Sequence, residues 1–319
     1  MTAGIVAAVI GSFAFAMAAV LQSMAAGWTA RREAAEAAAN PELACQAKAH
    51  PSLRSTMRTM LHWPFLVGMA LDVVGFVATI VSSRLIPLFL SQSIIAARLV
   101  VTALLALVML KVALRTRDWI AGSVVILALV LLAVGAGPEG KVNDYWMHWA
   151  TIVAGFALFG LGIVLMRVMT THIASATGLV AGALFGVMAI ASRVVNGLTP
   201  FDLGALLTDP ALYALVFTGV TGFYLFTVAL QTGSVNGAAA ALVVGETVLP
   251  GAIGILLLGD SIRDGWTIST GLAFTAAVIG GIIVSSSSGV AAVEQGEAAA
   301  FTEPLQLGPP GGGKTPSES

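Results

Sequence analysis

Charge is what this sequence has least of. Only 10% of its 319 residues are charged and 58% are hydrophobic, whereas soluble domains average about 25% charged residues. A chain with so little charge cannot cover a water-facing surface, which excludes a soluble enzyme. The formal net charge of −1 also lacks the basic excess that nucleic-acid binding requires, so we expect no nucleic-acid partner.

Cysteine and aromatic residues are scarce as well. The single cysteine, Cys45, excludes a disulfide framework and a cysteine-based metal site. The four histidines are not spaced as metal ligands on a helix, and no nucleophile–base pattern is visible. We therefore expect no cofactor and no enzymatic activity. Glycine, in contrast, occurs 35 times, which suits closely packed membrane helices.

Long apolar runs take the place of the missing charge. A helix that crosses a bilayer needs about 20 apolar residues, and continuous runs of this length differ from the alternating ten-residue segments of membrane β-strands. We predict an all-α polytopic membrane protein whose environment is the lipid bilayer. Its nine predicted spans are 3–27, 63–83, 86–113, 118–137, 148–167, 174–196, 211–231, 236–259 and 266–285.

The distribution of lysine and arginine predicts the orientation of these spans. Cytoplasmic loops carry an excess of basic residues. The favoured arrangement has the N-terminus outside and the C-terminus inside, in the cytoplasmic membrane of a bacterium. Ten basic residues then lie on the cytoplasmic side, namely Arg31, Arg32, Lys48, Arg54, Arg58, Lys111, Arg115, Arg117, Arg167 and Lys314. Four lie outside, namely Arg84, Lys141, Arg193 and Arg263.

The chain divides into a transmembrane domain, 1–286, and a tail, 287–319. Within the domain we expect one repeat at about 1–137, with a partly helical cytoplasmic loop at 28–62, and a second at about 148–286. The tail is rich in Gly, Pro, Ser and Glu, so we expect disorder there. Its GPPGGGKT run, 308–315, matches a phosphate-binding loop in letters. It lacks the flanking strand and helix that such a loop needs.

An internal repeat is visible at a shift of 149 residues. Segments 104–135 and 252–284 each contain an apolar helix, a charged turn and a second apolar helix, and the shift places Gly122 over Gly271. The predicted orientation makes the two copies antiparallel across the membrane. Inverted repeats of this kind are typical of secondary transporters, which bind substrate near the midplane between the repeats.

The residues of the second copy carry a family resemblance. Segment 246–284 resembles the end of a drug/metabolite transporter (EamA-type) repeat in Pro250, Gly251, Gly254, Leu258, Gly259, Asp260 and Gly271. Segment 63–100 is similar to the second and third helices of NIPA-type magnesium transporters in Trp63, Gly68, Met69, Gly75, Ala78, Pro87, Leu90 and Ala96. The resemblance implies an inverted-repeat bundle and a transport function.

Two departures from the NIPA pattern weaken the expectation that the transported substrate is magnesium. Phe76 stands where the NIPA pattern has an acidic residue, and Gln92–Ser93 stand where it has Thr-Pro. We therefore expect the architecture to carry over better than the substrate.

Three charged residues, Asp72, Arg98 and Glu246, fall near the middle of predicted spans. Such residues usually face a bundle interior and mark a functional site. We predict an ion pair between Asp72 and Arg98, either in a substrate site or as a structural pair that orients two helices. Glu246 then remains unpaired and holds a proton or a cation. Asp72 and Glu246 are the metal ligands if a cation is carried.

Further candidates surround this group. We expect Ser91, Gln92 and Ser93 to hydrogen-bond a substrate, and Pro250 and Pro87 to kink or gate their helices. Pro250 also frees the backbone carbonyl of Glu246, which either coordinates an ion or is the by-product of a plain proline kink. Arg193 lies near a helix end, from which it could reach water. The remaining polar candidates, either in the site or in helix packing, are Tyr224, Gln231, Asn236 and Gln22.

A GxxxGxxxG pattern in the sixth span predicts close helix packing. Its residues are Gly178, Gly182 and Gly186. The partner helix belongs either to the same bundle or to a second copy in a homodimer.

Together these features predict a secondary transporter of the drug/metabolite superfamily that moves a small solute or a cation, Mg²⁺ among the candidates. Arg98 would repel Mg²⁺ and bind an anionic group. The alternative is a non-transporting membrane scaffold or accessory subunit.

Overall fold

The computed structural model describes residues 1–39, 62–169, 172–198, 202–232 and 235–301. Within them, nine helical segments are long and apolar enough to cross a membrane, which confirms an all-α integral membrane protein. Helices prevail because hydrocarbon offers no partner for a backbone N–H or C=O. The spanning elements are α1 (Thr2–Ala39), α4 (Trp63–Leu85), α5 (Leu88–Ala96) with α6 (Arg98–Leu105) and η1 (Ala106–Leu110), α7 (Thr116–Gly135), α8 (Tyr145–Val168), α9 (Ile173–Val194), α11 (Pro210–Thr232), α12 (Val235–Leu256) and α13 (Thr267–Ser285). Two short helices, α10 (Leu203–Thr208) and α14 (Ser288–Phe301), complete the set.

The third span is not one continuous α-helix. It changes from α5 to α6 at Ala97, whose ψ is −7°, and it ends in the π-helical turn η1. Pro87 precedes α5, and its carbonyl accepts hydrogen bonds from the backbone N–H of Leu90 and Ser91. The expectation that Pro87 kinks a helix is therefore wrong, because Pro87 begins one. Pro250 does lie inside α12.

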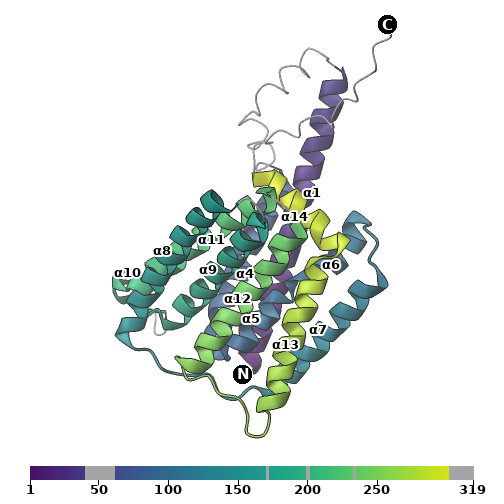
Figure 1. Cartoon of the computed structure of the whole chain (residues 1–319). Helices are drawn as coiled ribbons and strands as arrows, with labels where there is room; N and C mark the ends of the chain where they lie inside the picture. Colours follow the sequence, from purple (N-terminus) through teal and green to yellow (C-terminus); the bar gives the residue numbers. More distant parts are fainter. Residues whose placement is uncertain (40–61, 170–171, 199–201, 233–234, 302–319) are drawn as a thin grey trace.

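Helix boundaries recur at the shift found in the sequence. Moving α4, the α5–η1 span and α7 by 149 residues places each end within three residues of an end of α11, α12 and α13. Helices α7 and α13 lie side by side at one edge of the bundle (Figure 1) and run antiparallel. Gly135 at the end of α7 faces Thr270 near the start of α13, and Gly280 faces Ala121. These features are compatible with the predicted inverted repeat.

The glycines of α9 form a contact surface with α12. A Cβ on Gly178 would lie 2.5 Å from the Ala238 carbonyl oxygen, and one on Gly182 would collide with the Leu242 carbonyl oxygen. A Cβ on Gly186 would lie 2.9 Å from Cδ of the Pro250 ring. Small residues let two helix backbones approach closely, so this seam packs inside the chain. Because α12 occupies it, the seam is not a free surface for the homodimer considered above.

The expectation of disorder from residue 287 is wrong for 288–301, which form α14. Val290 and Val293 are fully buried, and Val293 packs against Val20 of α1 and Ala106 of η1. The two valines are three residues apart and so share one helix face. The tail's overall polar composition hid this short apolar stripe.

Other sequence expectations lie partly outside the described residues. Helix α1 continues to Ala39, so the predicted cytoplasmic loop 28–62 begins as helix, and 40–61 are not described. The GPPGGGKT run falls in 302–319, also outside the described part. The start of α1 and helix α14 lie at opposite ends of the bundle (Figure 1). Which end faces the cytoplasm stays a prediction.

Candidate functional site

An ion pair joins the two halves of the chain near the middle of the bundle. Arg98 Nη2, at the start of α6, donates to Glu246 Oε2 of α12 over 3.0 Å. The Glu246 side chain is 4% exposed and that of Arg98 is 21% exposed. The guanidinium also lies over the Phe15 ring of α1, 5.6 Å from its centroid, in a cation–π contact. Arg98 is thus held by both α12 and α1.

The predicted pair between Asp72 and Arg98 is not formed. Asp72 Oδ2 instead accepts a hydrogen bond from Gln22 Nε2 of α1 over 2.6 Å. The reason is the close packing of α1 on α4, since a Cβ on Gly68 would lie 2.8 Å from Gln22 Cγ. The prediction that Glu246 lacks a partner is also wrong. Because Asp72 bonds to Gln22, Arg98 remains free to pair with Glu246.

A signal for the observed pair was present in the repeat. The shift of 149 residues places Arg98 over Thr247, the neighbour of Glu246. Equivalent positions of an inverted repeat meet where they lie close to its pseudo-twofold axis. Glu246 is the charged residue next to the position equivalent to Arg98, so the repeat would have pointed to Arg98–Glu246 rather than to a pair from consecutive helices.

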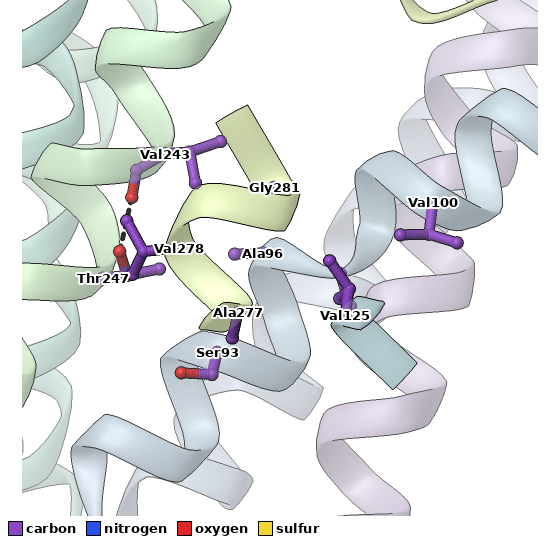
Figure 2. Close-up of a pocket in the computed structure, with 10 residues that line it drawn as sticks. Ser93, Ala96, Val100, Val125, Val243, Thr247, Ala277, Val278 and Gly281 are labelled. Carbon is purple, nitrogen blue, oxygen red and sulfur yellow. Dashed lines mark hydrogen bonds between the residues drawn. The ribbon is translucent and has the colours of Figure 1, made fainter. Parts of the chain in front are cut away.

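A small cavity lies between α5, α6, α7, α12 and α13 (Figure 2), lined in part by Ala97 and Thr247, the chain neighbours of Arg98 and Glu246. Its volume is about 10 Å³, close to the least room that one water molecule needs. Two hydroxyls line it: Ser93 Oγ donates to the Phe89 carbonyl and Thr247 Oγ to the Val243 carbonyl, each over 2.6 Å. The rest of the lining is apolar or glycine: Ala96, Ala97, Val100, Val125, Val243, Ala277, Val278 and Gly281.

Three of the residues considered above each have a buried polar atom without a hydrogen-bond partner in the described part of the chain. These atoms are the acceptors Glu246 Oε1 and Gln22 Oε1 and the donor Gln92 Nε2. Buried polar groups are normally hydrogen-bonded. Gln92 was predicted to bind substrate, whereas Gln22 was only a supporting candidate. The region thus has spare capacity to bind a small polar group.

A buried polar layer extends from this region toward the ends of α4 and α9. Ser82 and Ser91 share a hydrogen bond of 2.8 Å, as do Ser83 and Ser192. Arg84 donates to the Val195 carbonyl over 2.9 Å. Ser91, a predicted substrate ligand, is therefore engaged with Ser82.

The predicted outer end is closed by a second ion pair, between Arg193 and Asp260. Arg193 Nη2 donates to Asp260 Oδ1 over 2.7 Å, and the two side chains are 6% and 0% exposed. Asp260 also accepts from the backbone N–H of Leu88 and Gly140. Arg193 does not reach out to water, as considered above, but joins α9 to the α7–α8 and α12–α13 connections. Sequence reasoning noted Asp260 in a turn and missed this role.

A third polar cluster ties α8 to the start of α11. His148 Nδ1 lies 2.7 Å from Asp209 Oδ1, and Nε2 lies 2.9 Å from Asn143 Oδ1. Asp209 Oδ2 accepts from the backbone N–H of Asn196 over 2.8 Å. His148 is only 1% exposed. All partners of this cluster are satisfied, so we regard it as structural.

Several other candidates lie away from the ion pair. Tyr224 is 51% exposed and its ring meets the edge of Phe159, so its assignment to the site is wrong. Asn236 is exposed, and the side chain of Gln231 is outside the described part. No group of three His, Cys, Asp or Glu side chains that could hold a metal occurs among the described residues.

No protein-family model, curated protein or solved structure matches the chain.

Proposed function

We propose that this protein is a secondary transporter of the drug/metabolite superfamily that moves a small polar solute by alternating access. The observation that carries the proposal is the ion pair Arg98–Glu246. It connects the two halves of the chain near the middle of their spans, one residue from the position that the repeat makes equivalent to Arg98, and the neighbouring residues Ala97 and Thr247 line a small cavity. Charges are costly in hydrocarbon and are retained mainly where they serve a function.

The closed surroundings of the ion pair fit one state of an alternating-access cycle. Arg193–Asp260 and its backbone contacts close the predicted outer end. The cavity, at about 10 Å³, is too small for a solute. Solute binding then requires α5–α6 to separate from α12. The α5–α6 span bends most readily at the helix break at Ala97, and α12 bends most readily at Pro250.

A small organic solute fits the site better than Mg²⁺ does. Magnesium prefers carboxylate oxygens and keeps most of its water, whereas Glu246 already binds a guanidinium. A solute with an anionic group would bind Arg98, and a donor group would bind the free Glu246 Oε1. Mg²⁺ remains a member of the solute panel because of the sequence resemblance.

Cysteine accessibility tests the proposal without knowledge of the solute. Ser93→Cys is placed in a Cys45→Ala background and treated with a membrane-impermeant thiol reagent from each side of sealed vesicles. Alternating access predicts labelling from both sides. A scaffold predicts labelling from neither side, which would overturn the proposal.

Three controls define the expected signals. Asp264→Cys and Arg117→Cys are exposed at opposite ends of the bundle, so each should label from one side only. Val153→Cys is 65% exposed on an apolar helix face and should label from neither. Uptake of a panel of metabolites and Mg²⁺ into proteoliposomes then identifies the solute.

A further inference from the structure

Asp72 stands apart from the ion pair, although it lies close by. It is partly buried near the middle of α4, and its hydrogen-bond partner is the neutral amide of Gln22. Arg98 is near enough to act on Asp72 electrostatically, but its guanidinium is bonded to Glu246. Asp72 is therefore a carboxyl group inside a membrane span without a committed counter-ion.

The membrane-spanning parts of the neighbouring helices offer Asp72 no other free charge. Helices α1, α5 and α9 pack against α4. The span of α1 (2–25) and helix α5 contain no titratable side chain, and the one in α9, Arg193, is held by Asp260. With Arg98 and Glu246 neutralising each other, an ionised Asp72 would leave one net negative charge in hydrocarbon. Such a charge is costly, and binding a proton removes it.

Gln22 is suited to either protonation state of Asp72. It is 1% exposed, and its Oε1 has no partner among the described residues. The amide nitrogen donates to an ionised carboxylate, and the amide oxygen accepts from a protonated one after the amide turns over. In the structure the amide nitrogen is the donor, 2.6 Å from Asp72 Oδ2.

We propose that Asp72 is a proton-binding site, distinct from the Arg98–Glu246 pair, and that its proton drives transport. The proton comes from water on one side of the membrane and returns to water on the other. Only the second half of this inference, the coupling, rests on the proposed function.

Helix α1 links the two sites physically. It carries Gln22 to Asp72 and Phe15 to Arg98, and a Cβ on Gly75 of α4 would lie 2.9 Å from the Phe15 ring. When Asp72 loses its proton, its charge attracts Arg98 and weakens the bond to Glu246. The released groups are then available to a solute. Protonation of Asp72 restores the pair and closes the site.

Infrared spectroscopy of the purified full-length chain in lipid nanodiscs tests the proton site. At neutral pH the wild-type protein should show the carbonyl stretch of a protonated carboxyl group, and Asp72→Asn should lose that band. Asp264→Asn, which removes an exposed acid, should retain it. An unchanged band in Asp72→Asn would overturn the proposal. So would failure of this nearly isosteric variant to fold, because it would show that Asp72 works as an anion.

The pH dependence of Ser93→Cys labelling tests the coupling. With Asp72 present, the ratio of labelling from the two sides should change with pH, and with Asp72→Asn it should not. A ratio that keeps its pH dependence in Asp72→Asn would refute the coupling. If Ser93→Cys labels from neither side at any pH, the transport function fails, while the infrared band still decides the proton site separately.

Discussion

Removing Arg98 should destabilise the fold more than any other single change at the ion pair. Arg98→Met leaves the carboxylate of Glu246, 4% exposed, without its counter-ion. Breaking a buried pair from one side costs about 3–5 kcal/mol. Glu246→Gln should cost less, roughly 1–3 kcal/mol, because it removes a hydrogen bond to a charged group but leaves Arg98 near Asp72.

The double variant separates the contribution of the pair from that of each residue. Arg98→Met with Glu246→Gln should be more stable than the sum of the single effects predicts, by about 1–3 kcal/mol. The free energy of unfolding is measured in mixed micelles by the fluorescence of the six tryptophans. The matched cycle of Arg98→Met with Asp72→Asn should show a smaller coupling, since Asp72 bonds to Gln22.

Two results would refute this reasoning. Additive effects of Arg98→Met and Glu246→Gln, within about 0.5 kcal/mol, would mean that the two side chains do not interact. A larger coupling in the Asp72 cycle would restore the pair expected from neighbouring helices and remove Glu246 from it.

Three further predictions concern the remainder of the fold. Ending the chain at residue 287 should lower the free energy of unfolding by roughly 2–4 kcal/mol, because α14 buries Val290 and Val293. Ending the chain at residue 301 should leave the free energy of unfolding unchanged. Equal stability of the two shortened chains would mean that α14 does not pack on the bundle. Gly182→Ala should destabilise by about 1–3 kcal/mol through the collision with the Leu242 carbonyl. Gly160→Ala, with open space around it, should stay within about 1 kcal/mol, and similar losses in both variants would contradict the seam. Asp260→Asn should cost about 3–5 kcal/mol by leaving Arg193 buried without a counter-ion, and an unfolding midpoint equal to that of the wild type would show that this pair does not hold the outer end.

Hydrophobicity was sufficient to locate the membrane helices. A span is recognised from its length and composition, both of which are local properties of the sequence, so all nine predicted spans agree with helices of the structure. The place of Pro250 inside α12 and the close-packing glycines of α9 were also readable, because proline and glycine act on the backbone at their own position. The α14 stripe was missed because two valines carry little weight against a polar tail.

The partners of the charged residues depended on tertiary structure. Depth in the membrane follows from position along a span, and it placed Asp72, Arg98 and Glu246 together. Which two side chains meet depends on how each helix is rotated and which helices adjoin, and those are set by close contacts such as Gly68 against Gln22. Arg98 therefore pairs with a residue 148 positions away. Arg193, at the end of α9, likewise pairs with Asp260 in the connection between α12 and α13. Long-range packing of this kind leaves no mark in a local sequence pattern, apart from the repeat that relates position 98 to position 247.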